Sequence, residues 1–427
     1  MNRSSPSWMK LDNAALIYPA AARRDWNALF RLSAELTEEI DPATLSLALS
    51  RTLKRFPSFA VRLRRGIFWY YLEQLDGTPE IQKDVNNPCV RLAPSENGGF
   101  AFRVRYYKKR LALEVFHVLA DGTGAMSFLK TLVAEYLTIK HGLLIPRDSE
   151  VLDCDAPPHP EEYSDGFSSA AGSVSRSRSE PDAYRIKGTS ELDGFVHITS
   201  GKVPVAQVLS RSREKGVTLT EYLVTVLIES IAEIQYRESA GSRKKLKPVK
   251  CNVPINLRRF FKVNTKRNFA SYVNPGIDPN LGKYDFDEIL STVHHFLGTE
   301  LTAKMLSARI TTNVRTEHNP MLRVTPLFLK NLVMKTVYNI VGDRKSSTSF
   351  SNLGEVKLPP EMENYVTRVD CILGPLAQNR VVCAAASYKD TLYLNFTRTI
   401  EESDVERGFF TRLVRLGIPV LIESNQR

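Results

Sequence analysis

One stretch of the chain, Leu111 to Lys130, constrains the fold most, because its periodicity changes within a few residues. From Arg110 to His117 the sequence alternates and is rich in β-branched and large apolar residues, which predicts a half-buried strand. Asp121-Gly122-Thr123-Gly124 then supplies turn residues, and apolar residues recur at helical spacing from Met126 to Leu137. A strand therefore ends at His117 and a helix opens at Asp121, which places an imidazole and a carboxylate at one strand-to-helix corner.

This His-x-x-x-Asp-Gly pattern also has a purely structural explanation. A histidine at the end of a strand is usually structural, and an aspartate before a helix is usually an N-cap. The pattern arises by chance in roughly a few per cent of chains of this length. Its position at the end of a predicted strand favours a functional interpretation.

At 427 residues the chain is too long for one ordinary core, so two units of about 200 residues each are expected. A stretch rich in proline and serine, 153–190, has the composition of a linker. We therefore divide the chain into an N-terminal lobe (1–152), a crossover linker (153–190) and a C-terminal lobe (191–427). The N-terminal lobe is predicted to contain a helix that begins at Asp41-Pro42, a hairpin that turns at Gly66 and further antiparallel strands. The C-terminal lobe repeats this pattern of helices and strands and includes a hairpin across Lys389-Asp390. Both patterns predict an α+β fold with mixed sheets and flanking helices.

Composition excludes several classes of protein. No apolar run approaches the roughly 20 residues that span a bilayer. The short apolar run Ala14 to Ala22 is interrupted by Pro19, so it is interpreted as the first core segment of a cytoplasmic protein rather than a signal peptide. The five cysteines are odd in number and lack any C-x-x-C pair, so neither disulfides nor a metal site is expected.

The formal net charge of +11 attracts polyanions, which include nucleic acid, an anionic membrane and a phosphorylated cofactor such as coenzyme A. No nucleic-acid motif accompanies the charge, so a nucleic-acid partner is not expected. In two of the basic clusters the alternate spacing indicates one solvated face of a strand. The clusters are Arg62/Arg64/Arg65, Arg103/Arg105/Lys108/Lys109/Arg110 and Arg243/Lys244/Lys245/Lys247/Lys250.

Two later segments bear on a site. Thr325 to Val341 is the most hydrophobic helical stretch, and it is predicted to be a core helix; the alternatives are a helix that lines an acyl tunnel or touches a membrane. Ser346 to Val356 alternates hydroxyl-bearing residues, a pattern that suits a strand facing a polar cavity.

Three motifs in a fixed order now indicate a family: HVLADG at His117 to Gly122, NVPINLRRF at Asn252 to Phe260, and SNLG at Ser351 to Gly354. With them the whole chain resembles the His-x-x-x-Asp acyltransferase superfamily. This superfamily includes chloramphenicol acetyltransferase, plant alcohol acyltransferases, wax-ester synthases and condensation domains. The chain looks most like the alcohol acetyltransferase-like members. The resemblance implies two chloramphenicol-acetyltransferase-like lobes arranged as a V, with the active site at their junction.

The resemblance also implies a chemistry. Acyl-CoA is the co-substrate, no cofactor is tightly bound, and an alcohol accepts the acyl group. His117 acts as the general base that removes the acceptor's proton, without a covalent enzyme intermediate. Position 116 is Phe where some relatives carry a second histidine, a departure shared by several active branches. The Asp-Phe-Gly-Trp loop of the plant enzymes is missing, so their substrates are not assumed.

The supporting residues follow from the same resemblance. Asp121 is the structural aspartate that points away from the substrate; a buried carboxylate needs a partner, and Arg258 is expected ahead of Arg259. Gly122 permits the backbone of the turn. The oxyanion is stabilised by a hydroxyl or an amide. The candidates are Ser351 and Asn352, with Ser349 as an alternative on the same face as Ser351.

Two other functions stay open. One is a condensation-type transfer in which a carrier protein holds the donor or the acceptor. The other is a non-catalytic scaffold that binds an acyl chain or an anionic surface; in that case function would depend on Lys244 and Lys245 and not on His117. Peripheral membrane contact is compatible with all three functions.

Overall fold

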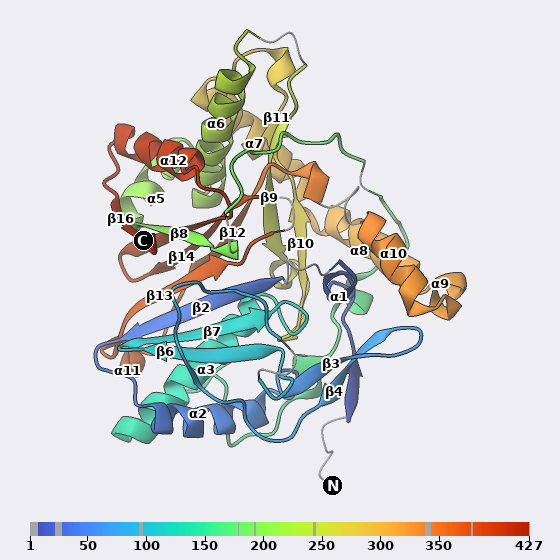
Figure 1. Ribbon diagram of the computed structural model, residues 1–427, viewed down its shortest axis with the longest axis vertical. Coiled ribbons are helices and arrows are strands. Elements are labelled where there is room, and N and C mark those ends of the chain that lie inside the picture. The colour runs from blue at the N-terminus through green and yellow to red at the C-terminus, as the bar shows by residue number, and fades with distance from the viewer. Residues whose placement is uncertain are drawn as a thin grey trace.

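Two sheets, each covered by helices, form two lobes that stack along the long axis of the molecule (Figure 1). The computed structural model describes residues 7–21, 28–93, 97–177, 179–191, 194–241, 245–337, 343–376 and 379–426. The predicted two-lobed α+β fold with mixed sheets and flanking helices is confirmed.

The sheet of the N-terminal lobe has the strand order β13-β2-β7-β6-β5 among the described residues. Neighbouring strands are antiparallel except for β5 and β6. A separate small sheet, β1-β4-β3, flanks it, and its β3–β4 hairpin is the one predicted around Gly66. The strands are β1 (Trp8–Lys10), β2 (Leu29–Leu36), β3 (Val61–Arg65), β4 (Tyr70–Gln74), β5 (Gln82–Lys83), β6 (Phe102–Tyr107), β7 (Arg110–Phe116) and β13 (Val366–Leu373).

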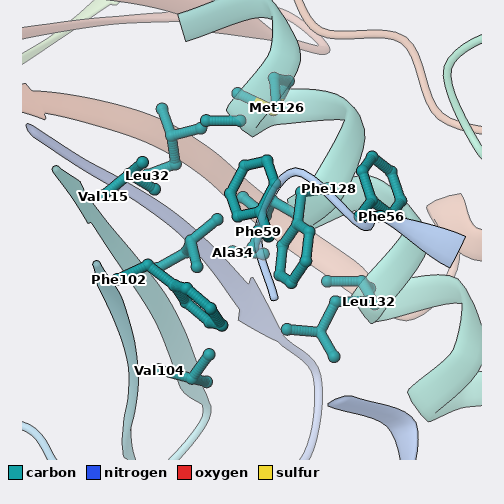
Figure 2. Packing of buried hydrophobic residues seen from close by; sticks show 14 of the residues in the cluster. Leu32, Ala34, Phe56, Phe59, Phe102, Val104, Val115, Met126, Phe128 and Leu132 are labelled. Atoms are coloured by element: carbon teal, nitrogen blue, oxygen red, sulfur yellow. The ribbon is translucent and has the colours of Figure 1, made fainter. Parts of the chain in front are cut away.

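Two helices, α2 (Pro42–Arg55) and α3 (Gly122–His141), cover one face of this sheet (Figure 1). Helix α2 begins as predicted, because the Asp41 side chain accepts a hydrogen bond from Thr44 N at 2.9 Å and Pro42 occupies the first turn. Between helices and sheet lies a cluster of aromatic rings, with Phe59 stacked on Phe128 at a centroid distance of 4.4 Å (Figure 2). This core fixes α3, and with it the corner where α3 begins.

Strand β13 comes from the later part of the chain but completes the N-terminal sheet. It pairs with β2 along its whole length, from Val366 opposite Leu36 to Leu373 opposite Phe30. The sequence-based division assigns all of 191–427 to the C-terminal lobe and does not anticipate this crossing. The two lobes are therefore joined by shared strands as well as by the linker.

The C-terminal lobe contains a larger mixed sheet with the order β10-β9-β12-β14-β15-β8-β16, in which β9, β12 and β14 run parallel. The predicted hairpin across Lys389-Asp390 is confirmed as β14–β15. Its strands are β8 (His197–Pro204), β9 (Val249–Asn256), β10 (Ala270–Val273), β11 (Gly276–Ile277, paired with β9), β12 (Thr348–Glu355), β14 (Val381–Tyr388), β15 (Thr391–Arg398) and β16 (Leu421–Ser424).

Helix α6 is almost entirely buried among the helices of this lobe, which suits its apolar sequence. Its N-terminus carries a capping box between Thr218 and Glu221. The helices of the later part of the chain are α5 (Val205–Glu214), α6 (Leu219–Ser239), α7 (Phe286–Glu300), α8 (Ala303–Glu317), α9 (Pro320–Val324), α10 (Leu327–Val337), α11 (Pro360–Glu363) and α12 (Asp404–Arg415); the short helices α1 (Ile17–Ala21) and α4 (Phe167–Ala170) precede them.

Two sequence-based expectations are wrong. The predicted core helix, α10, exposes most of its apolar side chains. The last residues predicted for this helix, 338–341, lie outside the described part of the chain. Ala22, the last residue of the first predicted core segment, also lies outside it. The strand face that carries Arg103 and Arg105 is buried instead of solvated, because both guanidinium groups surround the buried carboxylate of Glu114. Alternation locates one face of a strand but does not reveal which face is covered. Arg243 and Lys244 also lie outside the described residues.

Candidate active site

The predicted strand-to-helix corner is present. Strand β7 ends at Phe116, one residue before His117, and α3 begins at Gly122 with Asp121 as its N-cap. The His117 backbone N–H donates to Ala28 O at 3.0 Å, and Leu119 N–H closes a turn onto Phe116 O. The chain is therefore fixed on both sides of the imidazole.

The Asp121 carboxylate accepts three hydrogen bonds. Gly124 N–H donates to Oδ1 at 3.0 Å, which caps α3. Arg258 Nη1 and Phe269 N–H both donate to Oδ2, at 2.7 and 2.8 Å. Asp121 is buried, and its three partners come from α3 and from the segment that follows β9 in the other lobe. The carboxylate is therefore a connection between the lobes.

Arg258 and not Arg259 provides the ion pair. Its guanidinium group is held by two backbone carbonyls, Thr265 O at 2.9 Å and Arg267 O at 2.6 Å, in addition to Asp121. The side chain of Arg259 is exposed. Arg258 therefore reaches the junction with a fixed geometry.

Gly122 has a different local role from the one expected, because its φ angle is not positive. A side chain at this position would instead meet Leu353 of β12, since an added Cβ would lie 2.6 Å from Leu353 Cδ2. Gly124 is still more constrained, because an added Cβ would lie 1.9 Å from Lys266 O. The two glycines thus allow the start of α3 to lie close to the Leu353 side chain and the Lys266 backbone of the other lobe.

The His117 imidazole makes a hydrogen bond through Nδ1 to Oδ1 of Asn268, at 2.9 Å. The amide nitrogen of Asn268 donates to Asp12 Oδ2 at 3.1 Å and to the carbonyl oxygen of His117 at 2.9 Å. Both of these partners are acceptors, so the NH₂ group must face them and the amide oxygen must face the ring. Nδ1 therefore carries the proton in the neutral imidazole, and Nε2 carries the free lone pair.

Aromatic rings enclose the imidazole. Tyr18 of α1 stacks on His117 at a centroid distance of 4.7 Å, and Phe30 of β2 lies at 5.0 Å. The residue is only partly buried, yet desolvation by its surroundings lowers the pKa of the imidazole below its ordinary value. The neutral, basic form is therefore favoured at neutral pH.

Behind Asn268 lies the carboxylate of Asp12, which is fully buried. Burial raises the pKa of this carboxyl to about 6, although Arg267 at 3.4 Å opposes the shift. Asp12 Oδ1 also accepts a hydrogen bond from Ala15 N–H at 2.8 Å. A chain of hydrogen bonds thus runs from Asp12 through Asn268 to His117.

The three predicted oxyanion candidates lie on two different faces of the serine-rich strand β12. Ser349, Ser351 and Leu353 share one face, and Leu353 contacts the start of α3. Ser351 lies opposite Ala384, which belongs to the core of the N-terminal lobe, so this face is turned toward the corner.

Asn352 lies on the other face of β12. Its amide nitrogen donates to Thr220 Oγ1 of α6 at 2.9 Å, and its amide oxygen accepts from Gly354 N–H at 2.8 Å. The structure therefore turns Ser351 toward the N-terminal lobe but not the Asn352 side chain. Ser349 is on the same face as Ser351, but its hydroxyl donates to Asn252 O of β9 at 3.3 Å.

Three residues of the corner, Asp12, Tyr18 and Asn268, were not predicted from the sequence. Asp12 precedes, and Tyr18 lies within, a short apolar run that resembles ordinary core; Asn268 lies in a loop without periodicity. No spacing signal was available for any of them.

No cluster of metal-ligating side chains occurs in the described residues. Within the same ranges, no helix is long and apolar enough to cross a membrane. Cavities of about 220 and 260 Å³ lie in the C-terminal lobe, beside α6, and do not include the His117 corner.

Comparison with known proteins gives a consistent result. No protein-family model matches the chain, and no curated protein matches it. Solved structures do match over nearly its whole length. TRI101 of F. sporotrichioides, complexed with coenzyme A and T-2, has a TM-score of 0.66 and 12% identity, with 98% of this chain and 100% of that chain covered.

Two further structures have comparable scores. The first condensation domain of the calcium-dependent antibiotic synthetase has a TM-score of 0.61 and 14% identity, and 96% of each chain is covered. Polyketide synthase associated protein 5 from Mycobacterium tuberculosis has a TM-score of 0.60 and 14% identity, with 96% of this chain and 97% of that chain covered. The chain therefore has the two-lobed fold of this condensation domain and of TRI101.

Proposed function

We propose that the protein is a CoA-dependent acyltransferase that moves an acyl group from a thioester to an alcohol, with His117 as the general base. The observation that carries this proposal is the hydrogen bond between His117 Nδ1 and Asn268 Oδ1, from which the tautomer of the imidazole is assigned. Because Asn268 Oδ1 accepts from Nδ1–H, the lone pair on Nε2 is available to a substrate.

The proposed reaction balances without a covalent enzyme intermediate. The acceptor hydroxyl attacks the thioester carbonyl carbon while Nε2 of His117 takes its proton. The tetrahedral intermediate then collapses, the C–S bond breaks, and the imidazolium returns the proton to the departing thiolate. General-base assistance of this kind contributes roughly 10²- to 10⁴-fold, and alignment of the two substrates supplies much of the remaining acceleration.

The other residues of the corner have positioning roles in this proposal. Asn268 and Asp12 fix the tautomer and the orientation of the ring, and Asp121 with Arg258 holds the two lobes around it. Ser351 is the proposed donor to the oxyanion, because it lies on the face of β12 that is turned toward the start of α3. Acyl-CoA is the proposed co-substrate, since coenzyme A is bound in the TRI101 structure, which has the same fold.

The test measures thiol release from a panel of acyl-CoA thioesters, each with and without a panel of alcohols. We expect release that depends on the alcohol in the parent protein and none above background in His117→Ala. The matched control is His295→Ala, because His295 is an exposed histidine on α7. Equal thermal unfolding of parent and variants would show that the loss is chemical. If His117→Ala retained full activity, the assignment of the base would be wrong.

The fold similarity to condensation domains supports a second candidate, in which a carrier protein presents the acyl group. Free acyl-CoA would then give no thiol release with any alcohol, whereas a loaded carrier protein would. His117→Ala would still abolish transfer, so the two donors distinguish the candidates without changing the proposed base.

A further inference from the structure

A second feature of the molecule lies outside the His117 corner. Helices α9 and α10 lie beside the β3–β4 hairpin at one edge of the molecule (Figure 1). Their outward side chains are large, apolar and exposed, and the hairpin tip adds more of the same kind. The apolar face, as we define it, consists of Ile67, Phe68, Trp69, Met321, Leu322, Val324, Phe328, Leu329, Leu332 and Val333.

The orientation of α10 is the reverse of that in an ordinary surface helix. Phe328, Leu329, Leu332 and Val333 form one continuous outward stripe at i, i+1, i+4 and i+5, with Phe328 62% and Leu332 65% exposed. A helix that packs on a soluble protein normally turns such a stripe inward.

The polar groups of α10 are used against the protein instead. Asn331 Nδ2 donates to the Tyr70 hydroxyl at 2.8 Å, and Lys330 Nζ donates to Phe68 O at 2.8 Å. The helix is also fixed at its start, where Leu327 N–H donates to Ile67 O at 2.8 Å. Since these contacts determine which side faces inward, the apolar stripe is held outward by the fold.

The exposed charges that border the apolar face are mainly positive. Residues 318–342 contain Arg323, Lys330 and Lys335 and no Asp or Glu. In the hairpin, Glu73 pairs with Arg62 and Arg64, and Arg65 lies next to the tip. Arg65, Arg323 and Lys335 are exposed. Apolar and aromatic side chains bordered by cations are typical of surfaces that lie at the interface of a bilayer.

From this arrangement we propose that the apolar face docks onto an anionic phospholipid membrane, with the stripe of α10 and the hairpin tip inserted among the lipid headgroups. Charge complementarity favours this occupant over a second copy of the chain. A symmetric dimer through the same face would bring the cations that border it close to the cations of the second copy, and like charges repel. A bilayer that carries anionic lipids accommodates both the apolar side chains and the cations.

The test is co-sedimentation with lipid vesicles made of phosphatidylcholine alone or of phosphatidylcholine mixed with phosphatidylserine. We expect the parent protein to bind the mixed vesicles and to bind less as salt is added, because exposed charges are screened. Phe328→Ser with Leu332→Ser should weaken binding by about 100-fold or more, since burial of each large apolar side chain contributes about tenfold or more. Both side chains are exposed, so the variant should unfold at the same temperature as the parent.

The matched control is Leu144→Ser with Leu281→Ser, because these two leucines are exposed elsewhere; it should bind like the parent. Arg323→Gln with Lys335→Gln should weaken binding to the mixed vesicles by about fivefold for each cation. The proposal fails if the parent does not bind the mixed vesicles, or if the Phe328/Leu332 variant binds as the parent does. It also fails if sedimentation velocity reveals a dimer that the same variant dissociates. None of these results depends on the proposed acyltransferase activity.

Discussion

Asp121 is expected to stabilise the junction between the lobes, and Asp121→Asn tests this. The carboxylate uses Oδ1 for Gly124 N–H and Oδ2 for both Arg258 and Phe269 N–H. An asparagine has one acceptor oxygen, so in either orientation its NH₂ group must face a donor. At least one buried donor loses its partner, and the Arg258 guanidinium loses its counter-charge.

The expected magnitude follows from these contacts. Removing one partner of a buried ion pair typically destabilises a protein by about 3–5 kcal/mol. Asp121 and Arg258 have side chains that are 6% and 14% exposed, so the lower part of that range, about 3 kcal/mol, is expected. The N-cap itself contributes almost none of the loss, because asparagine caps helices as well as aspartate does.

The measurement is urea-induced unfolding followed by tryptophan fluorescence, for Asp121→Asn, Arg258→Met and the double variant. The control is Asp285→Asn, because Asp285 is an exposed N-cap of α7 that forms no ion pair within the described residues. Its replacement should change the free energy of unfolding by less than about 0.5 kcal/mol. Coupling between Asp121 and Arg258 should amount to at least about 1 kcal/mol. If Asp121→Asn were as stable as the control, or if the two single changes were additive, the carboxylate would not connect the lobes as described.

Three further predictions concern the corner. Because burial lowers the pKa of His117, the acidic limb of kcat/KM should have its midpoint below the ordinary value of about 6.5, and a midpoint above 6.5 would contradict the assignment of this base. Asn268→Leu removes the acceptor for Nδ1–H, so kcat/KM should fall by about 10²-fold in initial-rate assays at saturating acceptor, with KM for acyl-CoA little changed. Gly124→Ala should destabilise the protein by about 1–3 kcal/mol or more in urea unfolding, because its Cβ would meet Lys266 O, whereas Gly298→Ala in the open interior of α7 should stabilise it by about 0.5–1 kcal/mol.

The corner could be predicted from the sequence because its determinants are local. Alternation ends at His117, helical spacing begins after Asp121, and both signals lie within one short stretch. The helix after Asp41-Pro42 and the hairpin at Gly66 were predictable for the same reason, since caps and turns depend on adjacent residues. Arg258 required the resemblance to a family in addition, because its distance from Asp121 along the chain carries no periodic signal.

The remainder of the site depends on contacts between distant segments. Asn268 reaches His117 only because the neighbouring Phe269 N–H is held by Asp121, and Asp12 reaches Asn268 from the N-terminal part of the chain. The burial of α10 was mispredicted because an apolar sequence shows only that a helix favours apolar contacts. It does not show whether the folded chain itself provides those contacts.

Strand β13 has a consequence for how the protein is made. Ser33 of β2 bonds to Asp370 of β13, and the two residues are 337 positions apart in the chain. A ribosome that has released the whole N-terminal half still holds one strand of that half's sheet, so β2 leaves the tunnel with an unpaired edge. Native closure of this sheet, and of the corner that it supports, must wait until translation has passed Leu373. Truncated chains that end before this residue should therefore be recovered as aggregates or as chaperone-bound species rather than as a folded lobe.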